Sequence, residues 1–233
     1  MQPLRSDERA ASIRMFLADP PRVHDGAPGG VWGTSTDCYE FMASHLPDNP
    51  STLETGLGLS TLMLGTWARS HTCVVGSQAQ VDALQAHARN RGYSLANTRF
   101  AVGSSDQVLP SLQLEPIDMF LIDGGHGYPL PVIDWYYGSL ALRAGGVVVV
   151  DDIQLPSVDD YLVRFLRADP RWLQVAGDGK WVAFRKEGDF SLREEWTEQG
   201  FLGAPRKSLS QRLKTGIHRR IAALGALDPR ERG

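Results

Sequence analysis

The stretch STLETGLGLS, residues 51–60, decides the fold. Residues 51–54 are typical of a strand, Gly56 and Gly58 form a turn at its end, and an apolar helical segment follows over 61–68. Glycine lets the backbone turn tightly and approach a ligand, and the N-terminus of the next helix points N–H groups at that ligand. Glu54 and Ser60 add polar side chains. A plain strand–helix turn shares this pattern, so both interpretations stay open.

The alternation of strand and helix continues along the chain. Further strands are expected over 72–75, 98–102, 117–122 and 147–150. The run 117–122 is apolar except for Asp118 near its start, as in a strand buried on both faces. Two apolar runs around Gly177-Asp178-Gly179 predict a β-hairpin. The fold class predicted is therefore α/β, a doubly wound, mostly parallel Rossmann-like sheet with a terminal antiparallel hairpin.

Some helix ends and faces can also be predicted. Asp37 is expected to cap a helix that ends near Leu46. Ser157, with Asp160 three residues on, has the pattern of a capping box. The helix that Pro129 begins is expected to bury the apolar residues Ile133, Tyr137 and Leu140.

Length and composition indicate one sizeable domain with additions. The 233 residues are divided into a lead-in over 1–34, the main domain over 35–186 and a C-terminal basic helical tail over 187–233. Within the lead-in, the glycine-rich loop at 29–33 is a candidate lid over the cofactor or, equally, a plain connector. The net charge of −3 gives no reason to expect nucleic acid as a partner. Cys38 and Cys73 lack the spacing of a zinc site or disulfide framework. No signal peptide or transmembrane segment is expected, so we predict a cytoplasmic protein with reduced thiols.

Acidic side chains follow two neighbouring strands of the predicted sheet. Asp123 comes at the end of 117–122, and Asp151 and Asp152 come at the end of 147–150. Adjacent strands lie ~4.8 Å apart, so the three carboxylates are expected to meet in the crevice where such sheets bind ligands. They would repel one another unless a cation such as Mg²⁺ or Ca²⁺ lay among them. Helix caps and a solvated acid are the alternative. His126 is a candidate general base, metal ligand or substrate contact, or an ordinary loop histidine.

Taken in order, these motifs resemble the class I S-adenosylmethionine (SAM)-dependent methyltransferases. The resemblance covers roughly residues 35–186 and is nearest to the metal-dependent O-methyltransferases that include macrocin-type sugar methyltransferases. It implies a seven-stranded sheet, with the Gly56–Ser60 turn around the methionine part of SAM. It also implies Mg²⁺ held by Asp123, Asp151 and Asp152, and Asp123 as a general base. The reaction implied is methylation of a hydroxyl group on a small molecule or sugar.

Two departures from the family pattern concern the cofactor. The second strand is followed by Ser77 and Gln78 in place of an acid that would bind the ribose, and the third by Gly103-Ser104-Ser105. The hydroxyl and amide groups of Ser77, Gln78 and Ser104 are expected to make weaker hydrogen bonds than carboxylates. A catalytically altered or inactive nucleotide-binding domain acting as a partner subunit is therefore the alternative function. A dinucleotide-dependent oxidoreductase fits less well, because the third glycine of that motif is missing.

Basic and apolar residues alternate at helical spacing over 206–224. Two interpretations fit this pattern. The favoured one is a helix that docks on the chain or on a second copy in a homo-oligomer, with a solvated basic face. The other is contact with an anionic membrane surface or an acidic partner.

Overall fold

The computed structural model describes residues 4–27, 30–195, 197 and 199. The chain divides into two compact units, Met1–Arg193 and Glu194–Gly233, and all the described helices and strands lie in the first. The basic helix predicted over 206–224 lies outside the described residues. Among the described residues, every helix is too short or too polar to span a bilayer.

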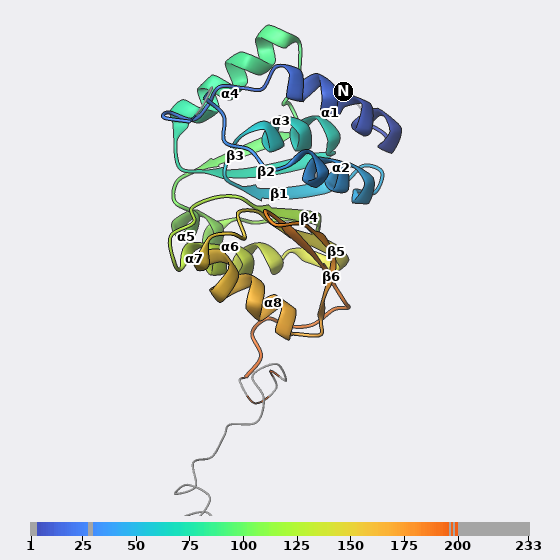
Figure 1. Ribbon diagram of the computed structural model, residues 1–233, viewed down its shortest axis with the longest axis vertical. Helices are drawn as coiled ribbons and strands as arrows, with labels where there is room; N and C mark the ends of the chain where they lie inside the picture. The colour runs from blue at the N-terminus through green and yellow to red at the C-terminus, as the bar shows by residue number, and fades with distance from the viewer. Residues whose placement is uncertain (1–3, 28–29, 196, 198, 200–233) are drawn as a thin grey trace, which may run out of the picture. The chain divides into compact units, whose positions relative to one another are not determined.

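A seven-stranded sheet forms the centre of the first unit, in the order β3-β2-β1-β4-β5-β7-β6 (Figure 1). Strands β1 to β5 pair in parallel, whereas β7 pairs antiparallel with both β5 and β6. This arrangement confirms the predicted fold class. The strands are β1 Ser51–Thr55, β2 Ser70–Val75, β3 Thr98–Val102, β4 Ile117–Ile122, β5 Leu142–Val150, β6 Trp172–Gly177 and β7 Val182–Lys186.

Helices cover both faces of the sheet, so the unit has three layers (Figure 1). The first layer holds α1 Ser6–Ala18, α2 Thr36–His45, α3 Leu59–Trp67 and α4 Gln78–Arg91. The second holds α5 Ser105–Val108, η2 Leu109–Ser111, α6 Leu130–Ser139, α7 Pro156–Val158, η3 Asp159–Val163 and α8 Arg164–Ala168.

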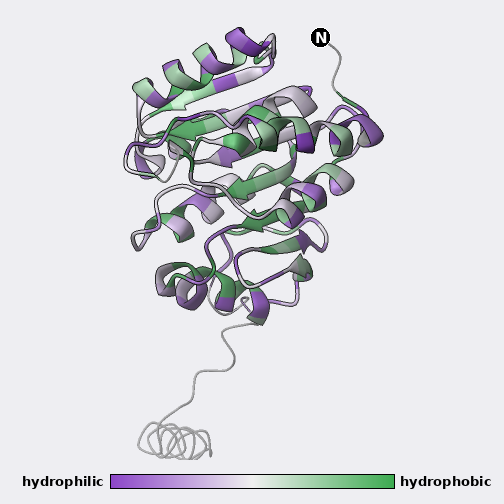
Figure 2. Cartoon of the chain, turned by 45° about the horizontal axis from the view of Figure 1, so that its top comes forward, coloured by the Kyte–Doolittle hydropathy of each residue, from purple (hydrophilic) through white to green (hydrophobic). Residues whose placement is uncertain are grey.

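Strand β4 is apolar from Met119 to Ile122, and its packing shows why. Met119 and Leu121 pack into the core under α1 to α4, whereas Phe120 and Ile122 pack into the core under α5 to α8. Side chains of a strand alternate between its two faces, and here both faces are buried. Figure 2 shows the hydrophobic strands between helices of mixed character. A fully buried side chain of this size contributes about 1.5–3 kcal/mol to folding.

Two predicted helix caps are wrong. Ser35, not Asp37, caps α2, because its Oγ accepts a hydrogen bond from the Cys38 N–H at 3.3 Å. The helix predicted at Ser157 instead starts at Pro156, with Leu155 at its N-cap and no side-chain cap. Proline suits the first helical position because the N–H group of a residue there has no partner within the helix. A residue without an N–H therefore loses no hydrogen bond. Each observed N-cap lies two residues before the predicted one, because the local backbone geometry decides which residue occupies the cap.

The buried face of α6 also differs from prediction. Leu140 is 41% exposed, and Ile133 and Tyr137 are only partly buried. The helix instead turns Asp134, Trp135 and Gly138 inward. A Cβ atom at Gly138 would lie 2.2 Å from the Phe120 ring. The close approach of α6 to β4 therefore selects this face over the more apolar one.

Candidate functional site

A cavity of about 750 Å³ lies at the carboxyl ends of the parallel strands. Ligands bind at this edge of open α/β sheets, beside the point where the strand order reverses. Here that point lies between β1 and β4. The lining residues are His24, Trp32, Gly33, Thr55–Gly58, Val74–Gly76, Gln80, Gly103–Ser105, Asp123–His126, Leu130, Asp151, Asp152, Gln154, Leu155 and Lys180.

The turns that line this cavity are tied together by backbone hydrogen bonds that extend the sheet beyond its strands. The N–H of Gly56 donates to Val74 O at 2.9 Å, that of Asp123 to Thr55 O at 3.0 Å, and that of Asp151 to Ile122 O at 3.0 Å. Each turn thus continues the parallel ladder by one residue. Three residues that lie far apart in the sequence, Gly56, Asp123 and Asp151, are thereby fixed along one edge.

The turn after β1 requires glycine at Gly56. Its φ is +96°, and a Cβ atom there would lie 2.0 Å from the backbone oxygen of Asp123. Because that obstacle is backbone, a side chain could enter only if the Asp123 turn moved. At Gly58, two residues on, an added Cβ atom would lie 3.4 Å from the His24 ring and 3.5 Å from Trp32 O, so the N-terminal loop passes close to this glycine. The two glycines predicted to bind a cofactor both line the cavity.

Glu54 and Ser60, also predicted to bind a cofactor, lie behind the cavity wall. Both are buried and neither is among the lining residues. The Ser60 hydroxyl donates to Glu54 Oε1, and Glu54 Oε2 is 3.3 Å from Nε2 of His71. Thr52 in turn bonds the other ring nitrogen of His71 at 2.9 Å. This buried network supports the glycine turn from within.

The polar residues after β2 and β3 are only partly where the sequence predicted them. Ser104 lines the cavity, whereas Ser77 lines an adjoining hollow of about 610 Å³. Gln78 lines neither, because its amide donates to Asp82 at 2.8 Å one turn along α4. Gln80 lines both hollows. The amide that faces the cavity at this position is therefore Gln80, which the sequence analysis missed.

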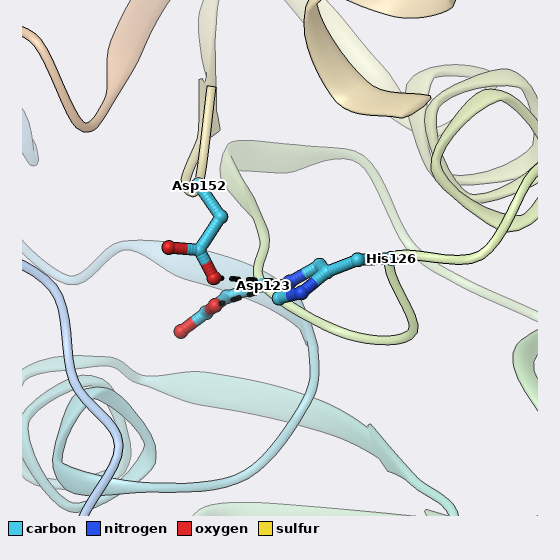
Figure 3. Close-up of side chains that lie close together, drawn as sticks. All are labelled: Asp123, His126 and Asp152. Atoms are coloured by element: carbon cyan, nitrogen blue, oxygen red, sulfur yellow. Dashed lines mark ion pairs between the residues drawn. The ribbon is translucent and has the colours of Figure 1, made fainter. Parts of the chain in front are cut away.

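Asp123, His126 and Asp152 converge on one point of the cavity (Figure 3). His126 Nε2 is 3.3 Å from Asp152 Oδ2 and 3.9 Å from Asp123 Oδ1. Asp152 has a φ of +56°, a left-handed conformation that aspartate tolerates better than most residues. Asp151 lines the cavity too, but its carboxylate accepts a hydrogen bond from Thr34 at 2.8 Å and pairs with Lys180 at 3.1 Å.

Residues of the lead-in form one wall of the cavity, beside the loop predicted to be either a lid or a plain connector. His24 Nε2 is 2.8 Å from Leu57 O, and the Trp32 N–H donates to His24 Nδ1 at 3.0 Å. Since Nδ1 accepts, Nε2 must carry the proton and donate to Leu57. Thr34, through its bond to Asp151, fixes the end of the loop.

Comparison with known proteins shows the same fold. Residues 53–153 match the family described as "Methyltransferase domain". The O-methyltransferase TomG from Streptomyces achromogenes, involved in tomaymycin synthesis and solved in complex with SAM, is 16% identical, with 80% of this chain and 92% of that chain covered and a TM-score of 0.55. This chain has the class I methyltransferase fold. No curated protein matches the chain.

Two further solved structures share this methyltransferase fold. An O-methyltransferase from Bacillus cereus, in complex with S-adenosylhomocysteine (SAH), is 18% identical over 77% of this chain and 91% of that chain, with a TM-score of 0.52. Precorrin 8w decarboxylase from Methanobacterium thermoautotrophicum is 17% identical over 69% and 95%, with a TM-score of 0.53. The fold thus accommodates more than one named activity, and the chemistry must be argued from the site.

The acidic groups of this methyltransferase fold have unequal proton affinities. Burial raises the pKa of Asp123 well above its usual range, and the nearby carboxylates of Asp151, Glu54 and Asp152 add to the rise. Burial also raises the pKa of Asp151. Burial acts in the same direction on Asp152, but hydrogen bonds from Lys180 and Gln154 outweigh it and lower the pKa of Asp152.

A magnesium site of the three predicted carboxylates does not fit this arrangement. Among the described residues, the acidic and imidazole groups that could surround one ion are Asp123, His126 and Asp152, whose candidate ligand atoms all lie within 4.8 Å of one another. Asp151 is not part of this group, and Lys180 pairs with both Asp151 and Asp152. Magnesium prefers oxygen ligands, so an imidazole in place of a carboxylate weakens the match further.

Lys180 and Thr34 are site residues that the sequence analysis missed. Lys180 lies in the connection between β6 and β7, and Thr34 lies in the lead-in. Neither residue belongs to a recognisable sequence motif. Each contacts Asp151 only because the fold brings distant parts of the chain together. The GDG turn at 177–179 pointed to the hairpin, but gave no sign that its next residue reaches the cavity.

Proposed function

We propose that this chain is a SAM-dependent O-methyltransferase that methylates a hydroxyl group of a small molecule or sugar. The observation that carries the proposal is the cavity itself, in which a glycine turn and a carboxylate–imidazole cluster face one space. The family match over 53–153 and the SAM and SAH complexes of the similar structures support the same cofactor.

The cavity supplies complementary groups for each part of SAM. Gly56 and Gly58 allow backbone to approach the methionine part closely. Gln80 and Ser104 offer hydrogen bonds near the ends of β2 and β3, where the nucleoside part would lie. Asp123 offers a carboxylate to a ligand that carries an ammonium and a sulfonium group. The repulsion among the site's carboxylates falls when such a cation binds.

His126 is the proposed general base. The hydroxyl oxygen of the acceptor attacks the methyl carbon, the carbon–sulfur bond breaks, and its electron pair stays on sulfur to give SAH. The proton of the hydroxyl passes to the other ring nitrogen of His126, Nδ1, because Nε2 is buried against the two carboxylates. Asp152 Oδ2 at 3.3 Å and Asp123 Oδ1 at 3.9 Å then stabilise the imidazolium. Because the predicted magnesium site does not fit, no step here depends on a metal ion.

A catalytically altered nucleotide-binding domain is the less favoured alternative. Such a domain has no need of an imidazole that two carboxylates can stabilise inside the ligand cavity. The decarboxylase of the same fold shows that the fold does not fix the reaction. Detection of a methylated product therefore has to accompany detection of cofactor binding.

Calorimetric titration of the full chain with SAM and with SAH tests the cofactor. Dissociation constants in the low-micromolar range are expected. No binding by well-folded protein at high ligand concentration would rule out the methyltransferase proposal. SAH release with a panel of phenols, hydroxy acids and sugars then tests the acceptor, and His126→Ala should keep SAH binding while it loses most turnover, because a general base contributes roughly 10²–10⁴-fold.

A further inference from the structure

A lysine ammonium lies within the acidic cluster of the site. Lys180 Nζ is 2.5 Å from Asp152 Oδ1 and 3.1 Å from Asp151 Oδ2, and the lysine lines the cavity. It thus bridges the two consecutive carboxylates that follow β5. A cation bound between those carboxylates would have to share this space with Nζ.

The backbone around Lys180 is held on both sides. Asp178 Oδ1 accepts hydrogen bonds from the N–H groups of Lys180 at 2.6 Å and Trp181 at 3.0 Å. The Lys180 carbonyl accepts from the Ile153 N–H at 2.9 Å, which ties the hairpin to the segment directly after Asp152. The backbone of Lys180 is therefore held in place beside Asp151 and Asp152, so its side chain pairs with them from a defined position.

Asp151 has little capacity left for another ligand. Its side chain is 1% exposed, one oxygen accepts from Thr34, and the other pairs with Lys180. Buried carboxylates need partners of this kind to stay charged. Together, Thr34 and Lys180 satisfy Asp151 without a metal ion.

We propose that Lys180 is the resident cation of this site, a positioning residue that holds Asp151 and Asp152 in place where a divalent metal would otherwise be required. The inference rests on the proposed function in one respect: it assigns metal-independent methyl transfer to the same cavity. Asp152, oriented by Lys180 through one oxygen, presents the other to His126. Lys180 itself forms no bond to the cofactor or the acceptor.

Binding of Mn²⁺ to the full-length protein, followed by electron paramagnetic resonance with SAH present and absent, tests the proposal. Wild type should bind Mn²⁺ weakly. Lys180→Met leaves the carboxylates without their cation and should bind Mn²⁺ at least tenfold more tightly, whereas Lys180→Arg should behave as wild type. Arg185→Met is the matched control, because it removes a half-exposed cation of β7 that pairs with Glu187 outside the cavity.

The outcomes separate this inference from the proposed function. Mn²⁺ affinity that is already tight in wild type, or unchanged in Lys180→Met, would overturn the inference. If Lys180→Met does not fold, Lys180→Gln provides the same comparison with a polar side chain, and a failure of both to gain Mn²⁺ affinity counts equally against it. Absence of SAH binding to wild type would refute the proposed function, whatever the Mn²⁺ results. SAH binding and turnover by wild type should be the same in EDTA as in Mg²⁺, and dependence on Mg²⁺ would also overturn the inference.

Discussion

Replacement of Gly56 by alanine should damage both the stability and the cofactor site of this protein. At φ +96° an L-residue is strained, and the new Cβ would lie 2.0 Å from Asp123 O and 2.7 Å from Asp123 C. Both atoms belong to the backbone, so no side-chain rotation can relieve the contact. The turn that carries Asp123 must move away from the turn that carries Gly56.

The expected loss of stability has two sources, the strained backbone at residue 56 and the steric overlap of the new Cβ atom. A left-handed backbone costs a residue with a Cβ roughly 1–2 kcal/mol, and forced overpacking costs about 1–3 kcal/mol. A destabilisation of about 3 kcal/mol corresponds to a fall in Tm of roughly 6–12 °C for a chain of this size. A displacement of about 1 Å at Asp123 should weaken any function that depends on its position by on the order of 100-fold.

Thermal unfolding and SAH calorimetry of Gly56→Ala check these values. Gly76→Ala is the matched control, since Gly76 lines the same cavity but has no positive φ, and a Cβ atom there would meet no other atom within 4 Å. The control should keep a Tm within about 2 °C of wild type, as surface substitutions usually do. Equal Tm values and equal SAH affinities for Gly56→Ala and wild type would refute the steric reasoning.

Three further predictions test the surroundings of the site. Glu54→Ala leaves the buried His71 without its acidic partner and should cost about 3 kcal/mol in urea unfolding, and a loss below 1 kcal/mol would contradict the proposed support. Asp134 is fully buried, and desolvation raises its pKa to about 6. This carboxyl group therefore binds its proton more tightly in the folded than in the unfolded protein. The free energy of unfolding of wild type should fall by about 2–3 kcal/mol as pH rises from about 4 to about 6. Asp134→Asn should lack this fall in urea unfolding at several pH values, and parallel profiles would disprove the assignment. Gln80→Ala should weaken SAH binding about fivefold through one lost hydrogen bond, while Gln78→Ala, whose amide bonds within α4, should leave the SAH dissociation constant unchanged; the reverse ranking by calorimetry would exclude a role for Gln80.

The sequence predicted the part of the site that depends on strand ends. Gly56, Asp123 and Asp151 each follow a strand whose apolar pattern is plain, and parallel strands bring their carboxyl ends to one edge. Their proximity therefore follows from the strand–helix alternation alone. Which carboxylate oxygen faces the cavity does not follow, because the conformation of each turn decides it, as the left-handed φ of Asp152 shows.

Predictions of which side chains face the core or a ligand failed where they relied on residue type alone, because packing decided the orientation. Helix α6 buries Asp134, and Leu140 directly after it is exposed, because Gly138 allows the close approach to Phe120. Glu54 and Ser60 carry polar groups that could bind a ligand, but their side chains form a hydrogen bond with each other in the interior. A side chain's chemistry limits its roles, whereas the surrounding elements decide whether it faces ligand or core.

The sequence by itself determined the α/β class, the parallel sheet with its terminal hairpin, and the edge at which the site lies, because these follow from local periodicity and from turns that glycine and proline mark. Only the tertiary structure decided that Thr34 and Lys180 complete the acidic cluster. They lie 117 and 29 residues from Asp151 along the chain, and no local pattern connects them. Contacts across such distances depend on how the lead-in and the hairpin pack against the sheet, so the charge balance of the site is a property of the fold.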